Sequence, residues 1–198
     1  MWLLKPFEDR TGAYALKALS LFNDNDINWL NWYVENHLTI EPGKTGNLNN
    51  EGNLSSGRKS DVSWLMPTDE NLRFYFEKIA YCINKANTDY FQFSLTGFHA
   101  IQYTLYHETV EGKYDWHMDT GDLYTTQNMG RKLSAVIALN DDFEGGVFET
   151  LDSDTPRSYD LRKGEMLMFP SFMLHRVTPV TRGTRRSLVV WVEGPNFK

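Results

Sequence analysis

The sequence has one cysteine, Cys82, among its 198 residues. A single cysteine excludes an internal disulfide and a zinc site made of several thiolates. No apolar run approaches the roughly 18 residues that a membrane-spanning helix needs. Residues 1–10 also lack the long apolar stretch that is typical of a signal peptide. We therefore expect a cytoplasmic protein of a reducing compartment, with no membrane partner.

An excess of positive charge is also missing. The chain has 20 Lys and Arg against 26 Asp and Glu, which gives a formal net charge of −6. Without a positive field over the whole molecule, phosphate backbones are not attracted, so we expect no nucleic-acid partner. A local basic patch could still bind a small anion.

Aromatic residues are abundant, with 12 Phe, 10 Tyr and 6 Trp. Such side chains favour half-buried strands, so the composition leans toward β structure. The content of 41% hydrophobic and 23% charged residues is typical of a globular protein and argues against a disordered or fibrous one. A chain of this length can bury enough surface to form one stable domain.

Two helices are predicted in the first part of the chain, which we expect to be mainly helical to about Ala86. Asp24 and Asp26 are candidate caps for the first helix, and Pro42 with Gly43 should stop it. The apolar positions of this helix recur at helical spacing: Ile27, Leu30, Val34 and Leu38.

The second predicted helix begins after Pro67, with Thr68 as its N-cap and acidic residues in its first turn. Its apolar stripe consists of Leu72, Phe76, Ile79 and Ile83. Both stripes predict helices that pack against a core. The segment between the helices, Glu41–Ser60, is rich in glycine, asparagine and serine. A stretch of this length without hydrophobic periodicity is either a lid over a site or disordered.

From Thr96 onward the pattern changes to short strands separated by turn signals. The candidate strands are Phe98–Tyr106, Lys113–Met118, Lys132–Leu139, Val147–Thr150, Arg157–Leu161, Glu165–Phe169, Leu174–Val180 and Arg186–Glu193. No helical pattern interrupts them, which argues against a parallel α/β sheet and favours an antiparallel sandwich or jelly roll. We therefore expect a mainly β protein with flanking helices. Residues 1–95 would form a helical support with a lid-like loop at 41–60, and residues 96–198 a jelly-roll core in the same globule.

A histidine and an aspartate lie two positions apart in one predicted strand. Because alternate residues of a strand share a face, His117 and Asp119 can reach one ion together. His175 follows after several predicted strands, which can bring it back beside His117. Two histidines and one carboxylate form the facial triad of non-haem iron oxygenases, although zinc accepts the same ligand types. An isolated histidine is more often an interior residue, so the prediction depends on the three residues together.

A cationic motif follows ten residues after His175. Two-residue alternation places Arg185 and Ser187 on one face of the last predicted strand, with Trp191 on the same face, where it can line a cavity. The Arg185 guanidinium can bind a carboxylate through two hydrogen bonds, with the Ser187 hydroxyl as a further donor. Arg182 and Arg186 are more simply explained as solvated charges.

Taken together, these motifs resemble the 2-oxoglutarate- and Fe(II)-dependent dioxygenases, and most closely their prolyl 4-hydroxylase-like branch. The resemblance rests on His117-Met118-Asp119, His175 and Arg185 in the family's order and spacing, and the wider match covers about Thr96 to Glu193. It implies a double-stranded β-helix in which His117, Asp119 and His175 bind Fe(II). It also implies that Arg185 holds the distal carboxylate of 2-oxoglutarate. A tyrosine of that branch also contacts 2-oxoglutarate, for which Tyr106 is the first candidate and Tyr103 the second.

The resemblance implies a hydroxylase that oxidises its substrate while 2-oxoglutarate becomes succinate and CO2, with ascorbate as a possible helper. The expected substrate is a proline-containing peptide or protein. The site motifs do not encode the substrate, so two alternatives remain open. One is an oxygenase of a free amino acid or other small metabolite, and the other is a non-catalytic jelly roll that binds a metal.

Overall fold

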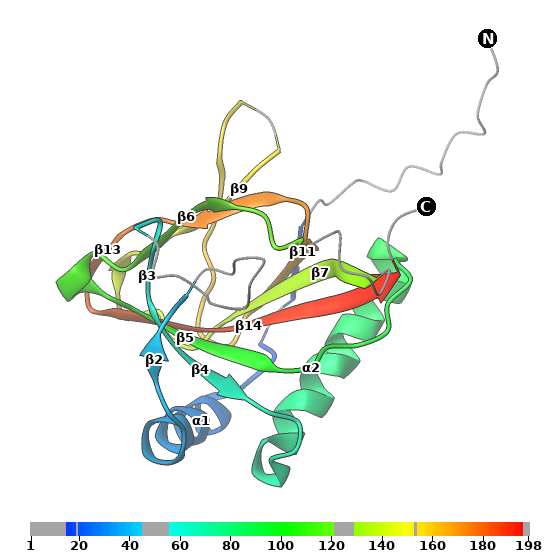
Figure 1. Ribbon diagram of the computed structural model, residues 1–198, viewed down its shortest axis with the longest axis horizontal. Helices are drawn as coiled ribbons and strands as arrows, with labels where there is room; N and C mark the ends of the chain where they lie inside the picture. Colours follow the sequence, from blue (N-terminus) through cyan, green and yellow to red (C-terminus); the bar gives the residue numbers. More distant parts are fainter. Residues whose placement is uncertain (1–14, 19, 45–55, 121–128, 153, 196–198) are drawn as a thin grey trace.

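The computed structural model describes residues 15–18, 20–44, 56–120, 129–152 and 154–195. Its elements form three layers: two helices, a large antiparallel sheet, and a smaller antiparallel sheet on the other face of the large one (Figure 1). This arrangement confirms the expectation of a mainly β jelly roll with flanking helices. In the described part of the chain, no helix has the length and apolar character needed to cross a membrane.

Helix α1 (Asp24–His37) begins with a capping box. The Asn23 side chain accepts a hydrogen bond from the Asp26 N–H at 3.0 Å, and the Asp26 carboxylate accepts one from the Asn23 N–H at 3.1 Å. The cap is therefore Asn23 and not Asp24 or Asp26, because only Asn23 precedes the first turn in extended conformation. The predicted stripe is confirmed: Ile27, Leu30 and Val34 are buried, and Leu38 packs at the helix end.

Helix α2 (Arg73–Ala86) follows a single 3₁₀ turn at Glu70–Leu72. Asp69 caps that turn by accepting the Asn71 N–H at 3.0 Å, so the predicted cap Thr68 is wrong by one position. The stripe on its buried face is confirmed. Glu70–Leu72 falls within the predicted helix but is a 3₁₀ turn, and two other single turns were not predicted: a 3₁₀ turn at Glu108–Val110 and a π turn at Asn87–Phe91.

The large sheet has seven strands, and its spatial order interleaves distant parts of the chain. In that order the strands are β1 (Leu16–Ala18), β11 (Met166–Pro170), β7 (Met129–Ala138), β14 (Thr184–Pro195), β5 (Ile101–His107), β4 (Asp61–Leu65) and β2 (Glu41–Pro42). The smaller sheet has five, in the order β10 (Arg157–Tyr159), β9 (Phe148–Leu151), β12 (Leu174–Val177), β6 (Lys113–His117) and β3 (Arg58–Lys59). A two-stranded ribbon joins β13 (Val180–Arg182) to β8 (Glu144–Gly145).

The helices cover one face of the large sheet and the smaller sheet covers the other. Alternate residues of a strand therefore belong to different hydrophobic cores. On β5, Ile101, Tyr103 and Leu105 belong to the core shared with the helices. Tyr106 belongs to a second core between the two sheets, together with Val136 of β7. Since successive side chains of a strand point to opposite faces, the strands β11, β7, β14 and β5 of the large sheet contribute to both cores. The space between the sheets is where the candidate site residues are placed.

The N-terminal segment contributes more strand than predicted. β1, β2 and β4 extend the large sheet and β3 extends the small one, although residues before Ala86 were expected to be mainly helical. These strands are two to five residues long, too short for the alternation to stand out in the sequence. The proposed lid, Glu41–Ser60, begins in β2 and ends beyond β3, and its middle, 45–55, lies outside the described residues.

Candidate metal centre and adjoining pocket

Three predicted ligands meet at one end of the small sheet. His117 ends β6, and His175 lies directly opposite it on the neighbouring strand β12, with ring centroids 4.1 Å apart. Asp119 follows two residues after His117. The ligand atoms of the three side chains all lie within 4.8 Å of one another. The sequence expectation that these residues come together is thus confirmed by the geometry.

Backbone carbonyls orient both imidazole rings. His117 Nδ1 lies 2.7 Å from the Asp115 carbonyl oxygen, and His175 Nδ1 lies 2.9 Å from the Met173 carbonyl oxygen. A carbonyl oxygen can only accept a hydrogen bond, so each Nδ1 carries the proton and each Nε2 keeps its lone pair. The two Nε2 atoms lie 3.6 Å and 3.4 Å from the Asp119 carboxylate oxygens. Both rings are therefore prepared to donate Nε2 to a cation.

Asp119 is a buried carboxylate, 6% exposed, held by hydrogen bonds. Among the described residues no Lys or Arg forms an ion pair with it, and Arg131 acts on it only from a longer distance. Its Oδ2 accepts a hydrogen bond from the Ser134 hydroxyl at 2.8 Å, and its N–H donates to the Ser171 carbonyl oxygen at 2.8 Å. A buried charge without a counter-charge is unfavourable in a folded protein. The His117 imidazole does not supply that charge, because burial and the neighbouring His175 lower the pKa of His117 to about 4.

A pocket adjoins the three ligands and ends at Arg185. Arg185 is 4% exposed and donates from Nη1 to the Ser187 hydroxyl at 2.9 Å. The Tyr106 ring lies beside it, with Arg185 Cζ 5.5 Å from the ring centroid. Burial lowers the pKa of Arg185, and no carboxylate of a described residue pairs with it. The pocket thus contains a buried cation without an anion, close to a buried anion without a cation.

Of the two candidate tyrosines, only Tyr106 lines this pocket. Tyr103 was the second candidate, but the structure places it on the opposite face of β5, where its hydroxyl donates to the Asn31 amide oxygen at 3.0 Å. The correction follows from parity, because residues three apart in a strand cannot share a face. Burial raises the pKa of the Tyr106 hydroxyl, which therefore keeps its proton as a hydrogen-bond donor.

Sequence reasoning missed several residues that line the pocket. The Tyr114 ring stacks on the His117 ring, with centroids 3.5 Å apart. Arg58 lies over the Tyr114 ring, with its Cζ 4.9 Å from the ring centroid. Gln102 also lines the pocket, and Trp191 does so as its parity predicted. Tyr114 precedes His117 by three residues, so regular alternation would place it on the other face; the register shift in the pairing of β6 with β12 accompanies the ring contact, and the sequence contains no signal for it. Arg58 gave no signal, because it belongs to the segment 41–60.

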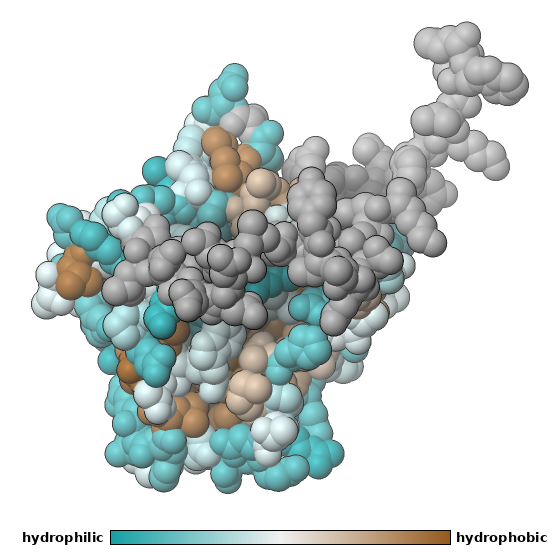
Figure 2. Space-filling model, viewed as in Figure 1, coloured by the Kyte–Doolittle hydropathy of each residue, from teal (hydrophilic) through white to brown (hydrophobic). Residues whose placement is uncertain are grey.

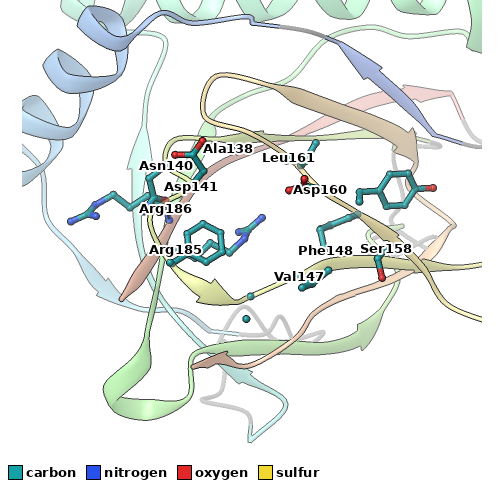
Figure 3. A pocket seen from close by; sticks show the side chains of 14 residues that line it. Ala138, Asn140, Asp141, Val147, Phe148, Ser158, Asp160, Leu161, Arg185 and Arg186 are labelled. Carbon is teal, nitrogen blue, oxygen red and sulfur yellow. Dashed lines mark hydrogen bonds between the residues drawn. The ribbon is translucent and has the colours of Figure 1, made fainter. Parts of the chain in front are cut away.

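A second cavity lies behind Arg185, and Figure 3 shows the Arg185 side chain among the residues that line it. Gly146 forms part of its wall, and a Cβ added there would come within 3.0 Å of Arg185 Cδ. This cavity is larger than the first, but it contains no imidazole and its acids are Asp141 and Asp160. The missing nitrogen ligands exclude it as the metal centre, and its glycine wall leaves room for Arg185.

The side chains of the pocket show which metal ion and which ligand could bind there. Two Nε2 atoms and one carboxylate oxygen, converging from one side, suit Fe(II) or Zn²⁺ and leave the pocket side open for other ligands. The unpaired guanidinium of Arg185, with Ser187 and Tyr106 beside it, suits a carboxylate. A metal and a carboxylate-bearing ligand next to it therefore fit the groups that are present.

The model of the 2OG-Fe(II) oxygenase superfamily matches residues 101–193, which contain all three ligands and Arg185. Over this region, just under half of its length, the chain is similar to this superfamily. Its name specifies Fe(II) as the metal and 2-oxoglutarate as the cosubstrate, and the donor set described above fits both. The expected resemblance, and Fe(II) and 2-oxoglutarate as cofactors, are thereby confirmed, while ascorbate stays a prediction.

Curated relatives in the superfamily are PKHD-type hydroxylases. The one from Idiomarina loihiensis is 36% identical over 91 residues, which is 43% of this chain and 40% of that protein. The one from Colwellia psychrerythraea is 27% identical over 139 residues, covering 68% of this chain and 60% of that protein. The chain thus spans about 40–60% of the length of the curated relatives it matches.

Solved structures share the fold. A prolyl-4-hydroxylase from Pseudomonas putida superposes with a TM-score of 0.68 at 20% identity, covering 89% of this chain and 91% of that one. A viral collagen prolyl hydroxylase from Paramecium bursaria Chlorella virus-1 gives 0.69 at 19% identity, covering 93% and 98%. A prolyl hydroxylase from Trichoplax adhaerens, in complex with a peptide fragment, gives 0.69 at 16% identity, covering 90% and 82%. These likenesses confirm the jelly-roll fold.

Proposed function

We propose that this protein is a 2-oxoglutarate- and Fe(II)-dependent hydroxylase that acts on a prolyl residue of a peptide or protein, with release of succinate and CO2. The observation that carries the proposal is the convergence of His117, Asp119 and His175 beside the buried cation Arg185. A metal ligand set and an anion site adjoin one pocket, as a metal-bound dicarboxylate requires.

In this proposal His117 and His175 hold Fe(II) through Nε2, and Asp119 holds it through a carboxylate oxygen. When bound, Fe(II) and 2-oxoglutarate supply, with dioxygen, the oxidising power for a C–H bond. The chain's own part is to fix geometry. The carbonyls of Asp115 and Met173 keep the imidazoles in the correct tautomer, and the Ser134 hydroxyl fixes the Asp119 carboxylate.

The other end of the pocket holds the cosubstrate. Arg185 donates two parallel hydrogen bonds to the distal carboxylate of 2-oxoglutarate, and the Ser187 and Tyr106 hydroxyls stand beside it as further donors. Because Arg185 is buried against the Tyr106 ring, its charge acts in a low dielectric and is poorly screened by water. Because both reactants are bound in one pocket, their reaction becomes effectively unimolecular and needs no encounter in solution.

Apolar side chains exclude water from the space between these two ends. Val136, Phe148 and Val189 line the pocket together with the aromatic rings of Tyr114 and Trp191. Flat aromatic faces suit an apolar ring such as that of a prolyl residue. The solved prolyl hydroxylases of the same fold, and the peptide bound in one of them, support a peptide substrate.

The test is succinate release from 2-oxoglutarate by the protein reconstituted with Fe(II) and ascorbate. We expect release to rise when a proline-rich peptide is added and to stay low with the same peptide in which alanine replaces proline. Release that rises only with a free amino acid or small metabolite would overturn the prolyl substrate and keep the reaction class. Metal binding without any 2-oxoglutarate turnover would instead indicate a non-catalytic metal-binding jelly roll.

A further inference from the structure

Arg58 is a second buried cation in the pocket, and the proposed function gives it no role. Its side chain reaches from β3 of the small sheet across to the large sheet, and the residue is 8% exposed. It donates from Nη2 to the Gln102 side-chain oxygen at 2.7 Å, from Nε to the Ser60 hydroxyl at 2.9 Å, and from Nη1 to the Lys44 carbonyl at 3.3 Å. All three acceptors are neutral.

A neutral set of acceptors leaves the charge of Arg58 unmatched. A guanidinium has five N–H donors, and the three bonds to described residues leave two of them without an acceptor. Buried arginines are ordinarily paired with a carboxylate or phosphate, since an unpaired buried charge is costly. Among the described residues no carboxylate pairs with Arg58, and its two remaining N–H donors can bind an anion.

The position of Arg58 points to the substrate. Its guanidinium lies over the Tyr114 ring, and that ring stacks on the metal ligand His117. The two arginines are next to different residues of β5. Arg185 pairs with Tyr106 in the sheet, whereas Arg58 donates a hydrogen bond to Gln102, four residues before Tyr106 on the same face. Arg58 thus enters the pocket from a different strand than Arg185, and the Tyr114 ring that it covers also contacts the metal ligand His117.

Charge balance gives the same result if the proposed function is correct. The two charges of Fe(II) match the two of the 2-oxoglutarate dianion, and Asp119 matches Arg185. Among the charged groups that line the pocket, Arg58 then has no counter-charge. Arg131 is a further cation nearby, but it lies over the Trp191 ring and experiences both Asp119 and Glu193.

We propose that Arg58 binds a carboxylate carried by the substrate close to the carbon that is hydroxylated. The inference rests on the metal centre and the 2-oxoglutarate site of the proposed function, and it narrows the substrate class to acids. The carboxylate can belong to a free amino acid, to the C-terminal residue of a peptide, or to an acidic side chain next to the target. The shared chemistry is a planar anion that accepts two N–H donors from one guanidinium.

The experiment compares acids with their amides, which differ by one charge and keep nearly the same shape. The protein is loaded with Fe(II) and 2-oxoglutarate without oxygen, so that binding is measured in the absence of turnover. Calorimetric titration then uses three pairs. These are L-proline and L-prolinamide, N-acetyl-L-proline and its amide, and a prolyl peptide with glutamate or glutamine beside the proline. We expect at least one acid to bind about tenfold or more tightly than its amide.

The variant Arg58→Gln distinguishes recognition of the substrate carboxylate by Arg58 from a structural role of this side chain. In that variant the acid should bind no more tightly than the amide, while the dissociation constant of the amide stays within about twofold of the wild-type value. Arg58→Lys keeps the charge but loses the planar fork, so part of the preference should remain. Lys59→Gln is the matched control, because it removes one positive charge from the next residue of β3. Lys59 does not line the pocket, and its removal should leave the acid preference unchanged.

The possible results distinguish a failure of the role of Arg58 from a failure of the proposed function. Equal binding of acid and amide by the wild-type protein, binding of none of the acids, or equal weakening of both by Arg58→Gln would overturn the role of Arg58. Each of these results leaves the proposed function standing as long as Fe(II) and 2-oxoglutarate still bind. Failure of the wild-type protein to bind 2-oxoglutarate in the same titration would reject the proposed function and, with it, this inference.

Discussion

Arg185 lies directly opposite Tyr106 in the antiparallel pair of β14 and β5, with its guanidinium carbon 5.5 Å from the centre of the tyrosine ring. The pair closes the inner end of the pocket whose other wall holds the metal ligands. Neither residue has an ionic partner among the described residues. The local sheet structure therefore builds an anion site from one strand pair, independently of the strands that carry the metal ligands.

The first prediction concerns the metal centre. His175→Ala should abolish tight Fe(II) binding and turnover together, because two remaining ligands rarely hold the ion. The loss should exceed the roughly 10–100-fold that removal of an outer hydrogen bond costs. Equilibrium dialysis with Fe(II), and with Mn(II) as an air-stable substitute, measures it. His99→Ala is the control, since the His99 side chain is 87% exposed. Unchanged metal affinity in His175→Ala would show that the ligand set is wrong.

Arg185→Ala should weaken 2-oxoglutarate binding and leave the metal in place. We expect a loss of about 30-fold or more, because removing one member of a buried charge pair costs roughly 2–5 kcal/mol. Arg185→Lys should retain part of the affinity, since it keeps the charge without the fork. Calorimetry with 2-oxoglutarate and dialysis with Mn(II) give the two readings. If the metal is lost from Arg185→Ala as well, the residue has been misassigned.

The two tyrosines of β5 form a matched pair for the third prediction. Tyr106→Phe should weaken 2-oxoglutarate binding by roughly tenfold, because a hydrogen bond to a charged group contributes roughly 1.5–3 kcal/mol. Tyr103→Phe should leave that affinity unchanged. It should lower the free energy of unfolding by about 1 kcal/mol through loss of the Asn31 hydrogen bond. Calorimetry and urea unfolding of both variants check the assignment, and the reverse pattern would contradict it.

Ser134→Ala should reduce metal affinity by about tenfold while the fold is kept, since the Ser134 hydroxyl orients the Asp119 carboxylate. Ser63→Ala is a suitable control. Ser63 is equally buried in the large sheet, and its hydroxyl has no hydrogen-bond partner in the described part of the chain, so its removal should change neither metal affinity nor stability appreciably. A wild-type metal affinity in Ser134→Ala would mean that the hydroxyl has no positioning role.

The last prediction concerns Gly146. It has a φ of +56°, and an added Cβ would press on Arg185 and Val180. Gly146→Ala should therefore destabilise the protein by at least about 1–2 kcal/mol and also weaken 2-oxoglutarate binding. Gly97→Ala separates the two effects, because Gly97 also has a positive φ but nothing lies within 4 Å of its Cβ position. That control should lose stability alone, as thermal unfolding and calorimetry will show.

Exposed apolar residues give no comparable prediction. Trp32, Tyr81 and Phe172 are exposed but belong to separate elements. The face in Figure 2 mixes hydrophilic and hydrophobic residues. Single exposed apolar side chains are ordinary on a protein surface and need no partner.

Much of the fold was predictable where a periodic pattern is long enough to be recognised. The helical stripes of α1 and α2 and most strands from β5 onward lie close to their predicted positions, because most of them bury one face over several turns or pleats. The short strands β8 and β13 were not predicted. The strands β1 to β4 were missed, since each is short and most are edge strands whose pairing is supplied by a partner far along the chain. Local patterns do not contain that information.

The sequence by itself determined that His117 shares a face with Asp119, and Arg185 with Ser187, because two-residue alternation follows from the covalent geometry of a strand. It also determined the order in which ligands and cation occur. Only the tertiary structure decided that His175 lies opposite His117, that Tyr106 and not Tyr103 faces the pocket, and that Arg58 enters it. Those relationships depend on which strands become neighbours, and long-range packing between the two sheets sets that choice.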